Sequence, residues 1–585
     1  MADNVLKGGE FLVKDVDPTT IFTPEDLDEE QKLMASATME FLEQEVLSKL
    51  DDIDAQKEGL MVELLNKAGE LGLLGVSIPE EYGGLGKDFN TATALSDVLG
   101  QGHSFTVALM AHTGIGTLPT LYYGNEEQKK KYLPKLATGE WKAAYCLTEP
   151  NAGSDAMNIK TKAVLSEDGS HYLISGTKIF ITNAGFADLF TVFAKIDGEK
   201  YTAFLVEKSF GNIELGPEEK KMGIKGSSTR PVYFDNTPVP KENVLGEIGK
   251  GHHIAFNILN IGRFKLAAAC VGAAKRAIKL AVNYSKERMQ FGKHIYEFGA
   301  IQHKIAEMAT YLYAVEAATY YVSDLINRKE KSLIDSGDIN KALIEAAREY
   351  AVEAAILKVA GSEMLDYVVD EGVQIYGGYG YIEEYPMARA YRDSRINRIF
   401  EGTNEINRLL IPGMLIRRAM KGELDLMTPA QQLMNEIMSI SLPEPAEGLL
   451  GEEKRAVTNM KKATLLLAGA ALQKYMQDIE NQQEILMNVA DMGINAFVAE
   501  AALARALKHG EAHPIMYDMA RLYVRKALAA VNRAGNEVIN AIAEGDEHRI
   551  LAGALKRWTK IEPINTIEIR RKIAKHMVDR GQYSL

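Results

Sequence analysis

The stretch RIFEGTNEINRLL, Arg398–Leu410, places one carboxylate at the start of a predicted helix. Glu401 follows the apolar Phe400 and precedes Gly402, and Thr403 is a residue type that commonly caps a helix N-terminus. Apolar residues then recur at helical spacing to the end of the stretch. Glu401 is therefore expected on a turn that leads into a helix, beside apolar side chains.

A half-buried carboxylate in such a turn is suited to proton transfer. Loss of hydration disfavours the charged form, so the pKa of Glu401 is expected to rise toward the range of a general base. Gly402 lets another group approach the main chain closely. The alternative is a surface glutamate in a helix-capping turn, which is the commoner situation for Glu when this stretch is taken alone.

The composition is that of an ordinary soluble protein. The chain has 585 residues, enough for several domains, and is 46% hydrophobic and 25% charged. Its formal net charge of -13 argues against nucleic acid as a partner. The two cysteines, Cys146 and Cys270, provide neither a disulfide framework nor a cysteine-based metal site, so no metal is expected and a reducing compartment fits.

The N-terminal sequence MADNVLKGGEFLVKDVDPTT lacks the apolar core of a signal peptide and is too acidic for a transit peptide. No apolar run is long enough to predict a transmembrane segment. We therefore expect a cytoplasmic protein.

Periodicity divides the chain into helical parts on either side of a β-rich part. Short runs such as HYLISGTKIFITNAG alternate with turn residues, whereas the flanking regions carry apolar residues every three or four positions. The predicted fold class is mainly α with an inserted β domain. Its predicted parts are an N-terminal arm (1–28), a helical domain (29–142), a middle β-barrel or sandwich (143–248), a helical-bundle catalytic domain (249–421) and a C-terminal helical extension (430–585).

Two further stretches could bind a cofactor. AYCLTEPNAGSD, Ala144–Asp155, contains Gly153 and Ser154, which allow a flat ligand to approach, and Thr148, whose hydroxyl can donate a hydrogen bond. An ordinary turn explains this stretch equally well.

ERMQFGKHIYEFGAIQ, Glu287–Gln302, follows a long predicted helix. Arg288 can pair with a pyrophosphate and Phe291 can stack on adenine, but an exposed helix end is the simpler interpretation of the spacing. VQIYGGYGYIEEYP, Val373–Pro386, is not a dinucleotide fingerprint, because no strand precedes it and it lacks the G-x-G-x-x-G spacing.

Together, in this order and spacing, these four stretches resemble the acyl-CoA dehydrogenases, FAD enzymes of fatty-acid β-oxidation. The resemblance runs from about Glu29 to about Lys421. The helical segment after Lys421 and the stretch LNIGRF, Leu259–Phe264, are similar to the very-long-chain group of that family.

The resemblance implies a set of FAD-binding residues. Many family members carry Trp where Phe180 stands, and a Phe keeps the stacking surface but loses the indole donor. The implied residues are Tyr145, Leu147, Thr148, Gly153, Ser154, Phe180 and Thr182 around the flavin; Arg288, Gln290, Phe291, Gln374, Gly377 and Gly378 around the pyrophosphate and adenine, reached from a neighbouring subunit; and Thr403, Asn404 and Glu405 after the carboxylate.

It also implies substrate contacts at Ser154, Asn260, Arg263, Phe400 and Gly402, with Asn260 and Arg263 near the CoA adenosine and the acyl entrance. An arginine in an apolar helix can equally belong to an internal ion pair. Some relatives carry the catalytic glutamate at the position of Gly262, which cannot act as a base. Glu401 is therefore the expected catalytic residue.

The implied activity is dehydrogenation of a medium- to long-chain fatty acyl-CoA to trans-2-enoyl-CoA. Glu401 would take the α-proton and FAD would accept the hydride. The resemblance further implies an electron-transfer flavoprotein as electron acceptor and a homo-oligomer, for which we prefer a dimer to a tetramer. The alternatives are an acyl-CoA oxidase that uses oxygen, a flavoenzyme acting on another acid or amine, and a non-enzymatic, helix-rich assembly protein.

Overall fold

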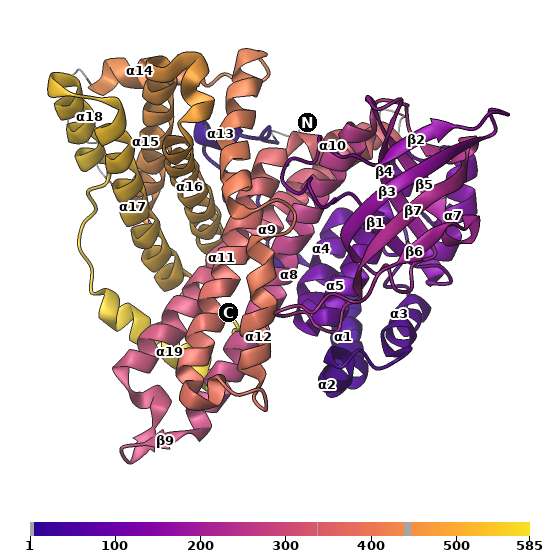
Figure 1. The fold of residues 1–585 in the computed structure, drawn as a ribbon. Coiled ribbons are helices and arrows are strands. Elements are labelled where there is room, and N and C mark those ends of the chain that lie inside the picture. The colour runs from indigo at the N-terminus through magenta and orange to yellow at the C-terminus, as the bar shows by residue number, and fades with distance from the viewer. Residues whose placement is uncertain (1–4, 336, 338, 438–445) are drawn as a thin grey trace.

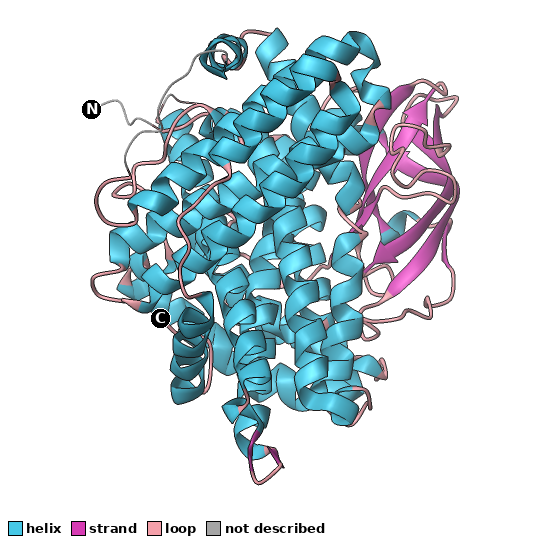
Figure 2. Ribbon diagram, turned by 90° about the vertical axis from the view of Figure 1, so that its left-hand side faces the viewer, coloured by secondary structure: helices cyan, strands magenta, loops and turns pink. Residues whose placement is uncertain are grey.

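The computed structural model describes residues 5–335, 337, 339–437 and 446–585. Helices form most of the molecule, and one sheet lies on one side of it (Figures 1 and 2). The predicted fold class, mainly α with an inserted β domain, is confirmed. Residues 1–4 and 438–445, which belong to the predicted arm and extension, lie outside the described residues.

The N-terminal helices pack beside the sheet (Figure 1). α1 begins after Asp28, whose side chain accepts a hydrogen bond from the Gln31 N–H at 2.8 Å. The residues before it are not a free arm, because Phe11 and Ile21 are buried in the core of the bundle and the extension. The helices of this part are α1 (Glu29–Phe41), α2 (Leu50–Asp54), α3 (Leu60–Glu70), α4 (Phe89–Leu99), α5 (Ser104–Ala111), α6 (Leu118–Tyr123) and α7 (Glu126–Thr138).

The middle part of the chain forms one sheet in the order β6-β7-β3-β2-β4-β5-β8, with β1 paired in parallel to β4. Inward side chains of β3, β4, β5 and β7 make its core. The strands are β1 (Ala143–Cys146), β2 (Lys162–Leu165), β3 (His171–Thr182), β4 (Leu189–Ile196), β5 (Lys200–Glu207), β6 (Ile213–Leu215), β7 (Thr229–Pro240) and β8 (Val244–Leu245).

The helical bundle is built on the long α8, which packs against α9 and α11. Alanines on α8 let its neighbours approach closely. The long helical stretch that begins near residue 340 is broken at Tyr350, where a non-helical residue separates α10 from α11. The elements are α8 (Gly251–Glu287), the hairpin strands β9 (Met289–Gln290) and β10 (Lys293–His294), α9 (Gly299–Ile334), α10 (Ile339–Glu349), α11 (Ala351–Tyr376), α12 (Pro386–Ser394) and α13 (Asn404–Met420).

The C-terminal extension is helical, as predicted, and it packs on the bundle. α16 and α19 contact α9, and α16 also contacts α13. One continuous hydrophobic core joins the bundle and the extension. The helices of the extension are α14 (Met427–Ile437), α15 (Gly451–Tyr475), α16 (Gln483–His509), α17 (Ile515–Ile542), α18 (Gly545–Trp558) and α19 (Thr566–Arg580).

Two helices, α8 and α16, are long and apolar enough to cross a membrane by length and composition, which the sequence analysis did not expect. Most residues of their apolar windows are buried inside the fold. Both helices therefore have the character of core helices of a helical bundle.

Candidate active site

Glu401 lies on the turn before α13, as predicted. Its φ of 58° and the φ of 81° at Gly402 put both residues in the left-handed region. The Thr403 hydroxyl caps α13 by accepting a hydrogen bond from the Ile406 N–H at 3.2 Å. A left-handed conformation is unfavourable for a glutamate and persists only where the surroundings hold it, which is typical of functional sites.

Two side chains, Arg263 and Asn407, hold this turn through its main chain. Arg263 Nε donates to the Glu401 carbonyl oxygen at 3.1 Å, and Arg263 Nη1 donates to Asn260 Oδ1 at 3.0 Å. Asn407 Nδ2 donates to the carbonyls of Gly402 at 2.9 Å and Thr403 at 3.0 Å. Arg263 is only 6% exposed. Among the described residues, Arg263 therefore forms no ion pair but supports the main chain of Glu401. The Glu401 carboxylate is not bonded to Arg263.

The Glu401 carboxylate projects over α8 at Gly262. A Cβ atom at residue 262 would lie 2.8 Å from Glu401 Oε2, so a glycine is required there while Glu401 holds this position. Oε2 is buried and has no hydrogen-bond partner in the described part of the chain. Burial raises the pKa of Glu401 to about 7, against the opposing charges of Arg263 and Lys358. A carboxyl group with this pKa can take a proton near neutral pH.

Lys358 is a supporting residue that the sequence analysis missed. Its Nζ donates to Asn404 Oδ1 at 2.7 Å, and burial lowers the pKa of this lysine to about 8. Asn404 also donates to Ser362 Oγ and Glu363 Oε1, each at 3.0 Å. Asn404 is therefore committed to contacts inside the bundle, whereas its neighbour Glu405 is exposed. No sequence motif marked Lys358, which lies in the middle of an Ala-rich helix.

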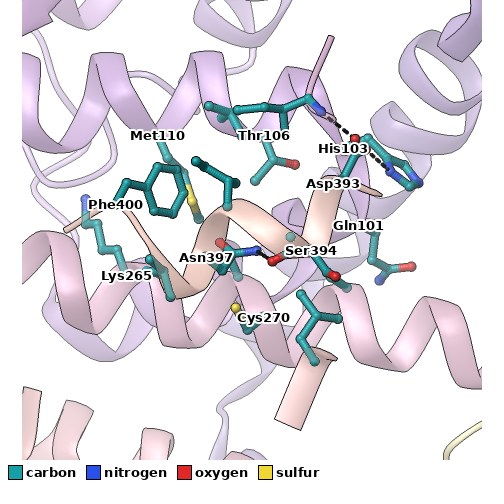
Figure 3. A pocket seen from close by; sticks show the side chains of 18 of the residues that line it. Gln101, His103, Thr106, Met110, Lys265, Cys270, Asp393, Ser394, Asn397 and Phe400 are labelled. Atoms are coloured by element: carbon teal, nitrogen blue, oxygen red, sulfur yellow. Dashed lines mark hydrogen bonds and ion pairs between the residues drawn. The ribbon is translucent and has the colours of Figure 1, made fainter. Parts of the chain in front are cut away.

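A cavity of about 170 Å³ begins at Glu401 and follows α8 from Gly262 to Leu280. Its middle is apolar, with Met110, Cys270 and Phe400 among the lining side chains. Figure 3 shows Phe400 and Lys265 at one end and Gln101, His103 and Asp393 at the other. The predicted substrate residue Phe400 thus lies in the cavity wall beside Glu401.

A planar ligand has room where the middle domain faces this cavity. Thr182 lines the cavity, and Phe180 is 60% exposed with a φ of 58°. The Ile179 N–H donates to the Thr148 carbonyl at 2.9 Å, which joins the two predicted flavin-binding stretches. A Cβ at Gly153 would meet no atom within 4 Å, so this side of the stretch is open.

Two other residues of the same set, Tyr145 and Leu147, have side chains buried inside the fold. Tyr145 is buried, and its hydroxyl donates to the Ala255 carbonyl at 3.3 Å. Leu147 is buried, and its carbonyl accepts from Lys178 Nζ at 3.2 Å. The side chains of Tyr145 and Leu147 thus support the stretch from the protein interior, whereas Ser154 is exposed.

The predicted pyrophosphate and adenine residues gather at the far end of α8. The Arg288 guanidinium lies 5.5 Å from the centre of the Tyr379 ring, which brings together segments about 90 residues apart. Phe291 is 94% exposed on the protruding β9–β10 hairpin (Figure 1). Gln290, Gln374, Gly377 and Gly378 are exposed as well.

These two groups of residues lie far apart on one chain. Arg288 follows Gly262 by 26 residues along α8, or about 39 Å at 1.5 Å per residue. Exposed aromatic faces at both places can stack on ring systems, and Arg288 can pair with a phosphate. Among the described residues, no group of three His, Cys, Asp or Glu side chains could hold a metal ion.

Comparisons with known proteins agree with this architecture. Family models described as acyl-CoA dehydrogenase N-terminal, middle and C-terminal domains match residues 28–140, 144–237 and 249–415, and a second C-terminal domain model matches residues 459–557. A probable acyl-CoA dehydrogenase of Bacillus subtilis is 48% identical over 100% of this chain and 99% of its own length. The very long-chain specific acyl-CoA dehydrogenase of Bos taurus mitochondria is 38% identical over 83% of this chain and 75% of its own length.

Among solved structures, an acyl-CoA dehydrogenase complexed with FAD from Bacillus anthracis superposes with a TM-score of 0.98 at 46% identity, covering 99% of this chain and 100% of that chain. Butyryl-CoA dehydrogenase from Megasphaera elsdenii covers 67% of this chain and 99% of its own, with a TM-score of 0.61 at 36% identity. The fold, the site and these matches define an FAD-dependent oxidoreductase. More narrowly, the chain belongs to the acyl-CoA dehydrogenase family.

Proposed function

We propose that this enzyme dehydrogenates long-chain fatty acyl-CoA thioesters to trans-2-enoyl-CoA in fatty-acid β-oxidation, with Glu401 as the α-proton base. The observation that carries the proposal is a lone carboxyl group of raised pKa at the start of a long apolar cavity. FAD, when bound, supplies the acceptor for the hydride that leaves the β-carbon. The main-chain N–H of Glu401 has no hydrogen-bond partner in the described part of the chain and is free to donate to the thioester oxygen.

The length of the cavity supports a long acyl chain. Gly262 and Leu280 are 18 residues apart on α8, which corresponds to about 27 Å. A C–C bond of about 1.5 Å advances an extended chain by about 1.25 Å, so this length accepts roughly 20 carbons. Small residues, Ala269, Ala273 and Ala277, line the α8 side and keep the cavity open.

A series of saturated acyl-CoAs from four to twenty carbons, scored by bleaching of the bound flavin, tests the function and the chain length together. We expect the highest kcat/KM at sixteen carbons or more. Ala273→Leu should shift the optimum to shorter chains, because the new side chain fills the middle of the cavity. Equal rates for four-carbon and sixteen-carbon substrates would refute the long-chain assignment.

We also propose that an electron-transfer flavoprotein accepts the electrons, as the resemblance implies. An acyl-CoA oxidase would use the same base but would return its electrons to oxygen. Stopped-flow reoxidation of the substrate-reduced enzyme in air separates the two, since fast reoxidation would favour the oxidase. We also propose a cytoplasmic location, which is supported by the similarity to a bacterial relative along the whole chain.

A homodimer that shares its FAD sites is the proposed assembly. The separation of about 39 Å between Gly262, beside Glu401, and Arg288, in the predicted pyrophosphate group, supports one FAD shared between two chains. The extension packs on α9 and α13 and so covers an outer face of the bundle, which supports a dimer over a tetramer. Light scattering should therefore give twice the chain mass of 64.5 kDa.

Arg288→Ala should weaken FAD retention, because one charge-assisted contact to a phosphate contributes about 1.5–3 kcal/mol. The released flavin is measured by its fluorescence after dilution. Lys279→Ala, an exposed cation on the same helix, is the matched control and should keep FAD.

Mixing subunits gives the decisive form of this test. In a dimer of one Glu401→Gln chain and one Arg288→Ala chain, shared sites would place both substitutions in one site and leave the other intact. Co-expression should then restore activity that neither variant has alone at limiting FAD. Absence of such complementation would show that each site belongs to one chain.

A further inference from the structure

The far end of the acyl cavity is polar, although its middle is apolar. Gln101, His103, Asp393 and Ser394 line this end, and α8 contributes Arg276 to the same cavity. Figure 3 shows Gln101, His103 and Asp393 together, away from Phe400. An apolar wall would suffice if the cavity received only the methyl end of a fatty acyl chain.

Three of these polar groups, His103, Asp393 and Ser394, already have hydrogen-bond partners within the protein. His103 Nδ1 lies 2.9 Å from Asp393 Oδ2, and Asp393 Oδ1 accepts a hydrogen bond from the Ile224 N–H at 2.5 Å. The Ser394 hydroxyl donates to the Tyr391 carbonyl at 2.8 Å. Both carboxylate oxygens of Asp393 are therefore already occupied by contacts within the wall.

The side chains of Gln101 and Arg276, by contrast, make no hydrogen bond or ion pair with any residue that the structure describes. Arg276 Nε is buried and unpaired. Burial lowers the pKa of Arg276, and the charge of Glu43 opposes this shift, so the guanidinium stays protonated but lacks a contact partner. A half-buried, unpaired arginine on a cavity wall favours an anionic ligand group.

The distance from Glu401 sets the size of that ligand. Arg276 follows Gly262 by 14 residues on α8, or about 21 Å. At about 1.25 Å per carbon, this distance corresponds to a chain of about 16 carbons. A terminal group of such a chain would reach Arg276 while the α-carbon lies at Glu401.

We propose that the enzyme accepts ω-carboxy fatty acyl-CoAs, the mono-CoA thioesters of long dicarboxylic acids, with Arg276 as the residue that binds the terminal carboxylate and Gln101 as a further polar group of the same cavity. This inference rests on the proposed acyl-CoA dehydrogenation. The reacting bonds are the same, and only the end of the chain that is remote from Glu401 differs.

The test compares hexadecanedioyl-CoA with palmitoyl-CoA in the full-length holoenzyme and in Arg276→Leu. We expect the ratio of kcat/KM for the dicarboxylic over the monocarboxylic substrate to fall about 10- to 100-fold in the variant, since one contact to a charged group is lost. Arg276→Lys should restore part of the ratio. Lys279→Leu, an exposed cation three residues further along, should leave it unchanged.

Binding without turnover gives an independent measurement. In the Glu401→Gln background, the Kd of each thioester is read from the perturbation of the flavin spectrum, and the same change in ratio is expected. Decanedioyl-CoA, which is too short to reach Arg276, should show no dependence on this residue. An unchanged ratio in Arg276→Leu, or equal dependence for the ten-carbon substrate, would overturn the proposal.

The two proposals fail in different ways. If palmitoyl-CoA bleaches the flavin and the ratio does not depend on Arg276, dehydrogenation stands and the ω-carboxylate site is refuted. If only the dicarboxylic thioester bleaches the flavin, the site is supported and the preference for simple fatty acyl chains is refuted. If neither thioester bleaches the flavin, both are refuted.

Discussion

Glu401→Gln should retain FAD and lose dehydrogenation by at least 10²–10⁴-fold, which is the usual contribution of a general base. Glutamine preserves the size of the side chain and the turn, because the contacts that hold the turn are made to main-chain carbonyls. It cannot take the α-proton, and among the described residues that line the cavity no other carboxylate lies near Gly262. Single-turnover bleaching of the flavin by palmitoyl-CoA measures the loss, with FAD content read from the flavin absorption.

Glu384→Gln, which removes an exposed carboxylate, is the matched control and should bleach like the wild type. The pH profile provides a second check. With the pKa of Glu401 near 7, the rate of flavin reduction should fall about tenfold per pH unit below 7 and level off above it. Bleaching at the wild-type rate by Glu401→Gln would contradict the assignment.

The raised pKa of Glu401 also affects how the stability of the protein depends on pH. This dependence runs in the opposite direction to that produced by a salt-bridged carboxylate. The folded pKa of Glu401 is raised from 4.5 to about 7, so ionisation is less favourable in the folded state. Its contribution to stability is present below about pH 4.5 and is lost as the pH rises through 7. The unliganded Glu401→Gln variant should therefore gain stability relative to wild type between these pH values.

The local chemistry of Glu401 could be predicted from the sequence because it depends on neighbours in the chain. Phe400, Gly402 and Thr403 determine the turn and the helix start, and the structure agrees with the predicted rise in pKa. The supports could not be predicted in this way. Lys358 lies more than 40 residues away in the sequence, and the contact of Arg263 with a carbonyl looks the same in sequence as an ion pair.

The direction in which a side chain points also could not be predicted from the sequence. Tyr145 and Thr148 belong to one motif, but Tyr145 lies in β1 and Thr148 lies just after that strand, so only the fold decides which of the two side chains is buried. The polar far end of the cavity was likewise hidden, because Gln101, Arg276 and Asp393 come from three distant segments. Each of them, taken alone, is an ordinary surface residue type.

For the C-terminal extension, too, the sequence predicted the helices but not the residues against which they pack. Its apolar stripes indicated that it must be buried against something, but not against what. In the structure, Arg505 of α16 is 1% exposed and lies 2.7 Å from Glu316 of α9 and 2.6 Å from Glu25 in the N-terminal segment. Lys275 of α8 lies 2.6 Å from both Glu316 and Asp97 of α4. This buried ion cluster joins the extension to three other parts of the chain.

Arg505→Met should destabilise the protein by about 3–5 kcal/mol, the usual effect of removing one partner from a buried ion pair. Methionine fills similar space, so the loss comes from leaving Glu25 and Glu316 with too little positive charge. The midpoint of urea unfolding measures the effect, and Arg521→Met, whose arginine is more exposed, is the control. A first unfolding step confined to the extension would be consistent with its docking through this cluster.

The pH dependence of the Arg505→Met effect separates charge from packing. Burial disfavours the ionised form of Glu316, but Lys275 and Arg505 outweigh it and lower its pKa below 4.5. The stability that this carboxylate contributes is present above about pH 4.5 and is lost as the pH falls through the folded pKa. The difference between wild type and Arg505→Met should therefore shrink on acidification, and adding Glu316→Gln to Arg505→Met should recover part of the loss at neutral pH. A loss that is independent of pH and unrelieved by Glu316→Gln would mean that Arg505 stabilises the extension by its volume alone.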